Sequence, residues 1–239
     1  MDNSNNILSF TYEDLVWFLH EQYGKGRFHA AAIFREVYKN ANIDFTKAKE
    51  FKNSPELARA LSKSLNLNLS PIIAEKRQGS LSKFITRLSD GFNIESVIVP
   101  MENHMTICIS SQAGCRMGCT FCETAQQGLN RNLTAQEIVE QVYRTKVLQK
   151  LDIRNIVFMG MGEPFDNFNN VIKAIKVINH DRGMAVAHRY ITISTSGHVK
   201  GIYKLAKLNW PNIRLAVSLN ASNDNVRSKL MPINNKYPM

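Results

Sequence analysis

The sequence predicts an α/β protein built from parallel β/α units, preceded by a small, mainly helical region. From about residue 104 onward, short β-branched runs alternate with helical patterns, which is typical of parallel β/α units. Residues 1–70 instead carry apolar side chains at helical spacing. We therefore predict a helical accessory domain over residues 1–92 and a partial (β/α) barrel, incomplete at its C-terminal end, over residues 93–239.

The N-terminal elements are predicted in order along the chain. Apolar residues recur at helical spacing over 11–39, with a break at Gly24, and a second, shorter helix is predicted over 55–68. Ser70-Pro71 marks a boundary. Alternating apolar residues then predict short strands within 81–100.

Four strands alternate with helices in the second part of the chain. The predicted strands lie at residues 105–109, 155–159, 190–194 and 213–218. The predicted helices lie at residues 134–148, 169–179 and 199–208, and Thr134 and Glu137 form a capping box at the start of the first. Four strands are too few for a closed barrel, so we expect either missing final units or an open sheet.

Amino-acid composition and net charge limit the kinds of protein that this chain can be. The 239 residues are 44% apolar and 21% charged, as in ordinary globular proteins. No window approaches the roughly 18 to 20 consecutive apolar residues of a membrane span, and no secretory signal is visible. We therefore expect a cytoplasmic protein with no membrane partner. The net charge of +10 favours a polyanionic partner, RNA or DNA first, although a basic protein without such a partner has the same balance.

All four cysteines lie close together in the sequence, at Cys108, Cys115, Cys119 and Cys122. A disulfide framework would spread its cysteines, whereas this grouping indicates metal or redox chemistry. In Cys115-x3-Cys119-x2-Cys122, three thiolates can ligate three irons of a [4Fe-4S] cluster. The fourth iron then stays open to the amino and carboxylate groups of S-adenosylmethionine (SAM). We call residues 115–122 the cysteine loop.

A zinc site is the alternative for these thiols. Cys108 or His104 would supply its fourth ligand, although common zinc modules use two separated ligand pairs. The protein would then be a zinc-stabilised RNA-binding module without catalysis. Iron–sulfur protein is brown and zinc protein is colourless, so the two readings are separable by eye.

Polar motifs follow the predicted strands at four places. They are the cysteine loop, Gly160-Met-Gly-Glu163, Ser194-Thr-Ser-Gly197 and Ser218-Leu-Asn220. Ligands of parallel sheets collect at the carboxyl ends of the strands, so we expect the four motifs to surround one mouth. Taken singly, such glycines are also common at βα turns, and a serine at a strand end is more often just a loop residue.

These motifs, in this order, resemble the RlmN family of radical SAM methyltransferases. The matching segments are 108–128, 158–164, 192–197 and 231–238, and the resemblance covers about 93–239 strongly and the N-terminal region loosely. It implies methylation of carbon 2 of an adenine in 23S rRNA and in some tRNAs, with one [4Fe-4S] cluster and SAM as cofactors. The nearest relatives are the Cfr methyltransferases, which act on carbon 8. At residues 124–127 and 162–164, this sequence resembles the RlmN family more than the Cfr methyltransferases.

The resemblance also implies roles for individual residues. Cys115, Cys119 and Cys122 are expected to hold the cluster. The expected SAM contacts are Gly162, Glu163, Ser194, Ser218, Leu219 and Asn220, with family members often having His in place of Asn220. Glu95 corresponds to the proton acceptor of the family, and Cys108 to the cysteine that forms a transient disulfide late in turnover.

Radical chemistry suits this target, because carbon 2 of adenine is electron-poor and does not attack a sulfonium methyl group. In the family, a cysteine near the C-terminus carries the methyl group, but this chain has none after Cys122. We therefore expect a fragment, or else a shortened relative, that binds the cofactors without completing turnover alone, and we favour the fragment. The other implied features are a flavodoxin or ferredoxin as electron donor, a monomeric state, and an N-terminal region that helps to hold RNA, for which a plain structural cap is the alternative.

Overall fold

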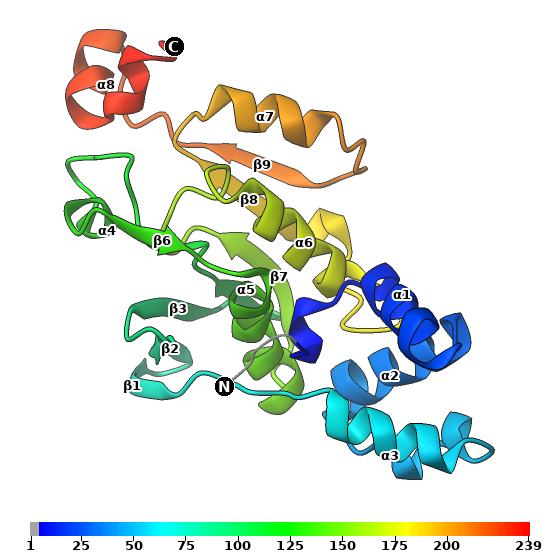
Figure 1. Ribbon diagram of the computed structural model, residues 1–239. Helices are drawn as coiled ribbons and strands as arrows, with labels where there is room; N and C mark the ends of the chain where they lie inside the picture. The colour runs from blue at the N-terminus through cyan, green and yellow to red at the C-terminus, as the bar shows by residue number, and fades with distance from the viewer. Residues whose placement is uncertain (1–4) are drawn as a thin grey trace. The chain divides into compact units, whose positions relative to one another are not determined.

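The computed structural model describes residues 5–239 and contains a seven-stranded mixed sheet and a separate two-stranded sheet (Figure 1). The strand order of the large sheet is β1-β2-β3-β4-β7-β8-β9. Its strands are β1 (Ile72–Gln78), β2 (Leu81–Arg87), β3 (Asn93–Pro100), β4 (Met105–Cys108), β7 (Ile153–Phe158), β8 (Ile191–Thr195) and β9 (Arg214–Val217). Strands β1 to β4 pair antiparallel, whereas β4, β7, β8 and β9 pair parallel. The predicted α/β class with a partial, open barrel is confirmed.

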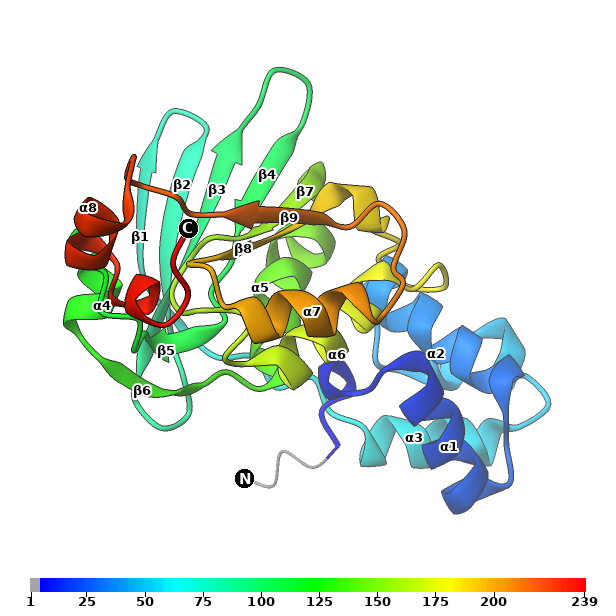
Figure 2. The ribbon, with the colours of Figure 1, turned by 90° about the horizontal axis from the view of Figure 1, so that it is seen from above.

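The chain divides into two compact units. The second unit, residues 70–133, 152–171 and 187–239, contains both sheets. Its small sheet pairs β5 (Gln112–Gly114) with β6 (Leu129–Asn132). Its helices are α4 (Glu123–Gln126), α7 (Val199–Ala206) and α8 (Asp224–Leu230). Figure 2 shows β1, β2, β3 and β4 side by side in that order within the large sheet.

The large sheet has one buried face and one open face, because side chains alternate along each strand. Residues paired across strands share a face. The buried face carries Ile98, Ile107, Ile156 and Ile191 across β3, β4, β7 and β8. The open face carries partly exposed residues in the alternate positions, namely Val97, Cys108, Val157 and Thr192.

The first unit is helical and comprises residues 5–69, 134–151 and 172–186. Its helices are α1 (Tyr12–Tyr23), α2 (Arg27–Asn40), α3 (Pro55–Ser64), α5 (Ala135–Val142), the π-helical segment η4 (Tyr143–Leu148) and most of α6 (Phe168–Asn179), with short 3-10 turns at Ile7–Ser9, Phe45–Lys47 and Lys49–Phe51. Gly24 ends α1 in the left-handed region, with φ 61°, which explains the predicted break. Buried aromatic side chains form much of the core, and the hydroxyl of Tyr143 donates to the Val37 carbonyl at 3.2 Å.

The units do not follow one cut in the sequence, since segments from the middle of the chain belong to the helical unit. The domain boundary that we predict at residue 92 is therefore not tested by this division and stays a prediction. Strand β1 and helix α8 were not expected, and the helix predicted to reach residue 148 continues beyond Val142 with π-helical hydrogen bonding. Among the helices of residues 5–239, none is long and apolar enough to cross a membrane.

Candidate active site

The cysteine loop is anchored at its base by the β5–β6 pair. The Cys115 N–H donates to the Gly128 carbonyl at 2.9 Å. Gly114, the last residue of β5, has φ 82°, and a Cβ atom there would lie 1.9 Å from the Gly128 oxygen. Only glycine permits this approach, so the sequence Gly114-Cys115 fixes where the loop leaves the sheet.

The three cysteines of the loop lie near one another and carry free thiols. Cys115 and Cys119 are buried and Cys122 is half-buried. Burial raises the pKa of Cys115 to about 11, and the neighbouring Glu163, Cys119 and Cys122 add to the increase. Burial raises the pKa of Cys119 as well, again with a contribution from Cys122.

Such thiols fit a cationic inorganic centre. Neighbouring thiols that are buried away from water lose their protons only when a positive charge compensates the negative charge of the thiolates. A bound metal centre supplies that positive charge. Within residues 5–239, no group of three or more His, Cys, Asp or Glu side chains is arranged to share a single metal ion. Thiolates are the usual ligands of a [4Fe-4S] cluster, so the three cysteines fit by their chemistry the cluster that the sequence predicts.

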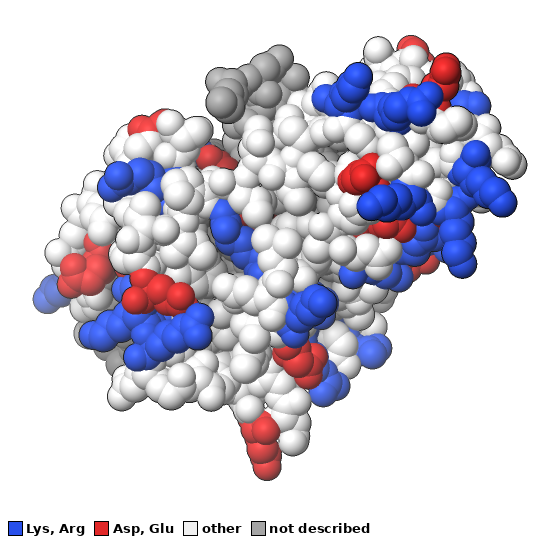
Figure 3. Space-filling model, turned by 90° about the horizontal axis from the view of Figure 1, so that it is seen from below, with Lys and Arg blue, Asp and Glu red and all other residues white. Residues whose placement is uncertain are grey.

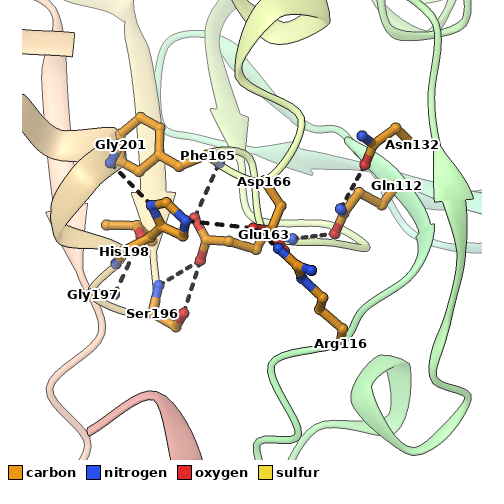
Figure 4. A network of polar contacts seen from close by, with 11 residues as sticks. Gln112, Arg116, Asn132, Glu163, Phe165, Asp166, Ser196, Gly197, His198 and Gly201 are labelled. Atoms are coloured by element: carbon orange, nitrogen blue, oxygen red, sulfur yellow. Dashed lines mark hydrogen bonds and ion pairs between the residues drawn. The ribbon is translucent and has the colours of Figure 1, made fainter. Parts of the chain in front are cut away.

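The turn after β7 packs directly on β5. Gly162 has φ 103°, and a Cβ atom there would lie 2.6 Å from the Gln112 Cβ. The Glu163 N–H donates to Gln112 Oε1 at 2.8 Å, and Gln112 Nε2 donates to Asn132 Oδ1 at 2.8 Å (Figure 4). This chain of contacts ties the Gly160–Glu163 turn to the small sheet that carries the cysteine loop.

The Glu163 carboxylate is buried, with the residue only 3% exposed. Its Oε1 accepts from the Phe165 N–H at 3.1 Å, and its Oε2 accepts from the Ser196 N–H at 2.8 Å and the Ser196 hydroxyl at 2.9 Å. A carboxylate offers about four lone-pair sites, so one remains for a further donor. The same negative charge contributes to the raised pKa values of Cys115 and Cys119, which places Glu163 beside the cysteine loop.

The ends of β8 and β9 lie next to each other. Ser194 is half-buried on the open face and pairs with Ala216. The Ser218 N–H donates to the Thr195 carbonyl at 2.9 Å. Leu219 and Asn220 are exposed, and Asn220 has φ 57°, a conformation that asparagine tolerates better than most residues. The predicted SAM contacts thus occupy two adjacent strand ends, with Glu163 hydrogen-bonded to Ser196 beside them.

Glu95 and Cys108 share the open face on neighbouring strands. Cys108 pairs with Val97, and Glu95 lies two residues before Val97 on the same face. Glu95 Oε1 forms a 2.7 Å ion pair with Lys83 Nζ of β2. Burial raises the pKa of the Cys108 thiol, and a hydrogen bond with the Met159 backbone lowers it in part.

A polar network beside the cysteine loop was missed in the sequence. Arg116 donates to both oxygens of Asp166, at 2.6 and 2.8 Å, and His198 Nε2 lies 3.5 Å from Asp166 Oδ1 (Figure 4). His198 Nδ1 accepts from the Gly201 N–H at 3.0 Å and caps α7. Arg116 directly follows Cys115, and that position was the only sequence signal for its role.

A buried arginine was also missed. Arg227 of α8 is 3% exposed and donates to the carbonyls of Ser196 and Ser218, at 2.8 and 3.0 Å. It therefore touches the loops that follow both β8 and β9. A charged residue in a short helix is usually predicted to lie on the surface. Only the position of Arg227 shortly before the 231–238 motif could have indicated its burial.

On the face shown in Figure 3, basic side chains occur in scattered groups with acidic side chains among them. In the helical unit, a hollow of about 620 Å³ is lined by Lys39, Lys146 and Lys150 and by no acidic residue. Phosphate groups interact favourably with such surroundings. The helical unit thus offers one place that suits a polyanion.

Comparisons with known proteins agree on one family. The family model described as "Radical SAM superfamily" matches residues 109–238. The probable dual-specificity RNA methyltransferase RlmN 1 of Protochlamydia amoebophila is 44% identical over 234 residues, which are 98% of this chain and 65% of that protein. The RlmN proteins of Geobacter sulfurreducens and Pelobacter propionicus are 41% and 38% identical over the whole chain, which covers 65% and 67% of their lengths.

A solved structure shows the same relationship. The crystal structure of a radical SAM methyltransferase from Sphaerobacter thermophilus matches with a TM-score of 0.86 and 35% sequence identity. The match covers 98% of this chain and 69% of that one. The chain spans 65% of the length of the first two relatives named above.

Proposed function

The chain belongs to the RlmN family of the radical SAM superfamily, and from that membership we propose that it supplies the cofactor-binding part of an RNA methyltransferase. The proposed reaction is methylation of carbon 2 of an adenine in 23S rRNA and tRNA. The relatives' names describe dual-specificity RNA methyltransferases. The observation that carries the proposal is the buried Glu163 carboxylate beside three neighbouring free thiols.

Each cofactor has its own residues in this proposal. Cys115, Cys119 and Cys122 hold the [4Fe-4S] cluster, which when bound supplies one electron to the sulfonium of SAM. The remaining lone pair of Glu163 accepts a hydrogen bond from the SAM ammonium group, a charge-assisted contact.

The other SAM contacts come from backbone and strand ends. Gly162, whose lack of a side chain allows close packing on Gln112, is proposed to contact SAM through its backbone. Ser194 and residues 218–220 contact the nucleoside from β8 and β9. Their adjacency in the sheet supports a shared ligand.

Glu95 and Cys108 are the proposed groups that finish the reaction on RNA. Both lie on the open face of the sheet, on neighbouring strands. Lys83 Nζ forms a 2.7 Å ion pair with Glu95 Oε1, and the Glu95 carboxylate is the group proposed to accept the carbon-2 proton. Burial raises the pKa of Cys108, so this residue starts as a neutral thiol. It must lose its proton before it can form the transient disulfide with the methyl-carrying cysteine of the family.

The partners follow from the same proposal. RNA suits the net charge of +10 and the lysine-lined hollow of the helical unit. A flavodoxin or ferredoxin would deliver electrons near the cysteine loop, where Phe121 is 54% exposed. We place the protein in the cytoplasm, as a monomer.

Anoxic reconstitution tests the cofactor part. The chain should take up iron and sulfide, turn brown, and show a change in the electron paramagnetic resonance spectrum of the reduced cluster when SAM is added. A colourless protein that retains zinc would instead favour the RNA-binding module. For the target atom, mapping of the adenines that the protein methylates separates carbon 2 from carbon 8, the Cfr-type alternative.

A further inference from the structure

Arg227 is a buried cation whose hydrogen bonds all go to neutral oxygens. Its Nε donates to the Leu219 carbonyl at 3.1 Å, and its Nη1 donates to the Asn234 side-chain oxygen at 2.7 Å. Its Nη2 donates to the Ser196 and Ser218 carbonyls. Within residues 5–239 it forms no ion pair with a carboxylate. Burying an unpaired charge is costly, so this arrangement needs a reason beyond stability.

The acceptors of Arg227 lie on the two loops that bear the proposed SAM contacts. Ser196 follows β8, and its N–H and hydroxyl hold the Glu163 carboxylate. Ser218 and Leu219 follow β9 and are proposed SAM contacts themselves. One planar guanidinium therefore sets the spacing between the two loops, and through Ser196 it also supports Glu163.

The guanidinium is itself fixed in place. Asn234 is 2% exposed, and its side-chain N–H groups donate to the Asp224 carboxylate and the Ser228 hydroxyl, both at 2.9 Å. These bonds orient the Asn234 oxygen toward Arg227. The RlmN-like segment at residues 231–238 thus includes Asn234, the residue that holds the Arg227 guanidinium in place.

Arg227 also lies near the cysteine loop. At the end of its helix, the Leu230 carbonyl accepts a 2.9 Å hydrogen bond from the Thr120 N–H of the cysteine loop. Helix α8 therefore contacts the cysteine loop and both strand-end loops.

We propose that Arg227 is a positioning residue that holds the two SAM-binding loops in one arrangement and keeps a positive charge, not paired directly with a carboxylate, beside the cysteine loop. The inference rests on the proposed function, because it assumes that the cluster and SAM bind here. Reduction adds negative charge to a cluster, so a nearby cation makes reduction easier. Lysine cannot replace the arginine fully, because it lacks the planar fork that reaches carbonyls on two loops.

Two substitutions separate the two effects in the anoxically reconstituted chain. R227M removes the charge and every hydrogen bond. It should weaken SAM binding about 10- to 100-fold, as losses of supporting partners do, and shift the midpoint potential of the cluster to more negative values. R227K keeps the charge, so its potential should stay near that of the wild type while SAM binding still weakens. Equilibrium dialysis gives the affinity, and a redox titration followed by electron paramagnetic resonance gives the potential.

A matched control is R144M in the helical unit. The Arg144 side chain is 15% exposed and pairs with Glu140 at 2.8 Å, so its loss also perturbs a largely buried arginine. R144M should leave both the SAM affinity and the potential unchanged. Equal shifts in R144M and R227M would overturn the inference, because general destabilisation would then explain both.

The remaining outcomes are also decisive. Wild-type SAM affinity and potential in R227M would overturn the role of Arg227 while leaving the proposed function intact. Failure of the wild-type chain to assemble a cluster would overturn the proposed function itself. If R227M does not fold, R227K decides, and wild-type SAM affinity in R227K overturns the positioning role.

Discussion

The backbone N–H of Glu163 donates a 2.8 Å hydrogen bond to Oε1 of Gln112, although 51 positions separate the two residues in the chain. The amide of Gln112 is held in that orientation by Asn132. The turn after β7 is thereby fixed against the small sheet that carries the cysteine loop. Tight packing between Gly162 and Gln112 is part of the same contact and can be tested separately.

G162A should destabilise the protein more than an ordinary glycine substitution at positive φ. The left-handed conformation alone costs about 1–2 kcal/mol, and the overlap with Gln112 adds about 1–3 kcal/mol. Urea unfolding of the cluster-free protein measures the loss. G91A is the matched control, with φ 90° and no atom within 4 Å of the new Cβ, and should cost only the conformational part. Equal losses would show that Gln112 moves aside freely.

Substitution of any cysteine in the loop should abolish the cluster. C115A, C119A and C122A each remove one of three thiolates, and a cluster with fewer ligands is not retained. The visible absorption and the iron content after anoxic reconstitution report the loss. C108A is the control, because Cys108 lies in β4 outside the loop, and it should keep its colour. A colourless C108A protein would mean that this thiol is a ligand.

E163Q should lose both SAM affinity and stability. In the wild type, both carboxylate oxygens of Glu163 accept hydrogen bonds from buried donors. In the variant, an NH₂ group replaces one of these oxygens, so a buried donor loses its acceptor at a cost of about 1–3 kcal/mol. The loss of the charged contact should weaken SAM binding about tenfold or more. Equilibrium dialysis and urea unfolding measure the two effects. E123Q, at an exposed carboxylate of α4, should change neither, and unaltered SAM binding in E163Q would contradict the assignment.

Acid should weaken the helical unit through Glu50. Hydrogen bonds from Arg35, at 2.5 and 2.7 Å, lower the pKa of Glu50 from 4.5 to about 2. A lowered folded-state pKa means that its stabilisation is complete above pH 4.5 and disappears as the pH falls toward 2. Since Arg35 is 39% exposed, solvent screening limits the contribution to about 0.5–1 kcal/mol.

E50Q should therefore be less stable than the wild type at neutral pH, and the difference should vanish as the pH approaches 2. Urea unfolding of the cluster-free protein at several pH values measures this difference. E56Q is the control, because the Glu56 side chain is 92% exposed. A stability difference for E50Q that persists unchanged into acid would rule out the ion pair as its source.

Local signals in the sequence predicted most of the second unit. The capping box of Thr134 and Glu137 is present, with both of its hydrogen bonds. The four β-branched runs form strands β4, β7, β8 and β9 within about two residues of the predicted positions. These features depend on near neighbours, and near neighbours are what a sequence pattern contains.

Features that depend on distant partners were not predictable. All seven residues of β1 are exposed, including Lys76 and Arg77, so no apolar alternation marks the strand, and its pairing with β2 alone defines it. The burial of Arg227 depends on carbonyls from two loops and on Asn234. The bidentate contact of Arg116 joins residues 50 positions apart. Motifs located the strand ends, but not the side chains that fix them to one another.

The alternation of faces along β3 constrains how this chain can change in length. Glu95 belongs to the open face, while Ile94 and Ser96 on either side of it are buried. Insertion or deletion of one residue between Glu95 and Val97 would invert that parity relative to the Val97–Cys108 pair and turn the carboxylate toward the buried side, away from Cys108. An added residue in the connecting turn at residues 101–104, by contrast, leaves the pairing of Val97 with Cys108 undisturbed.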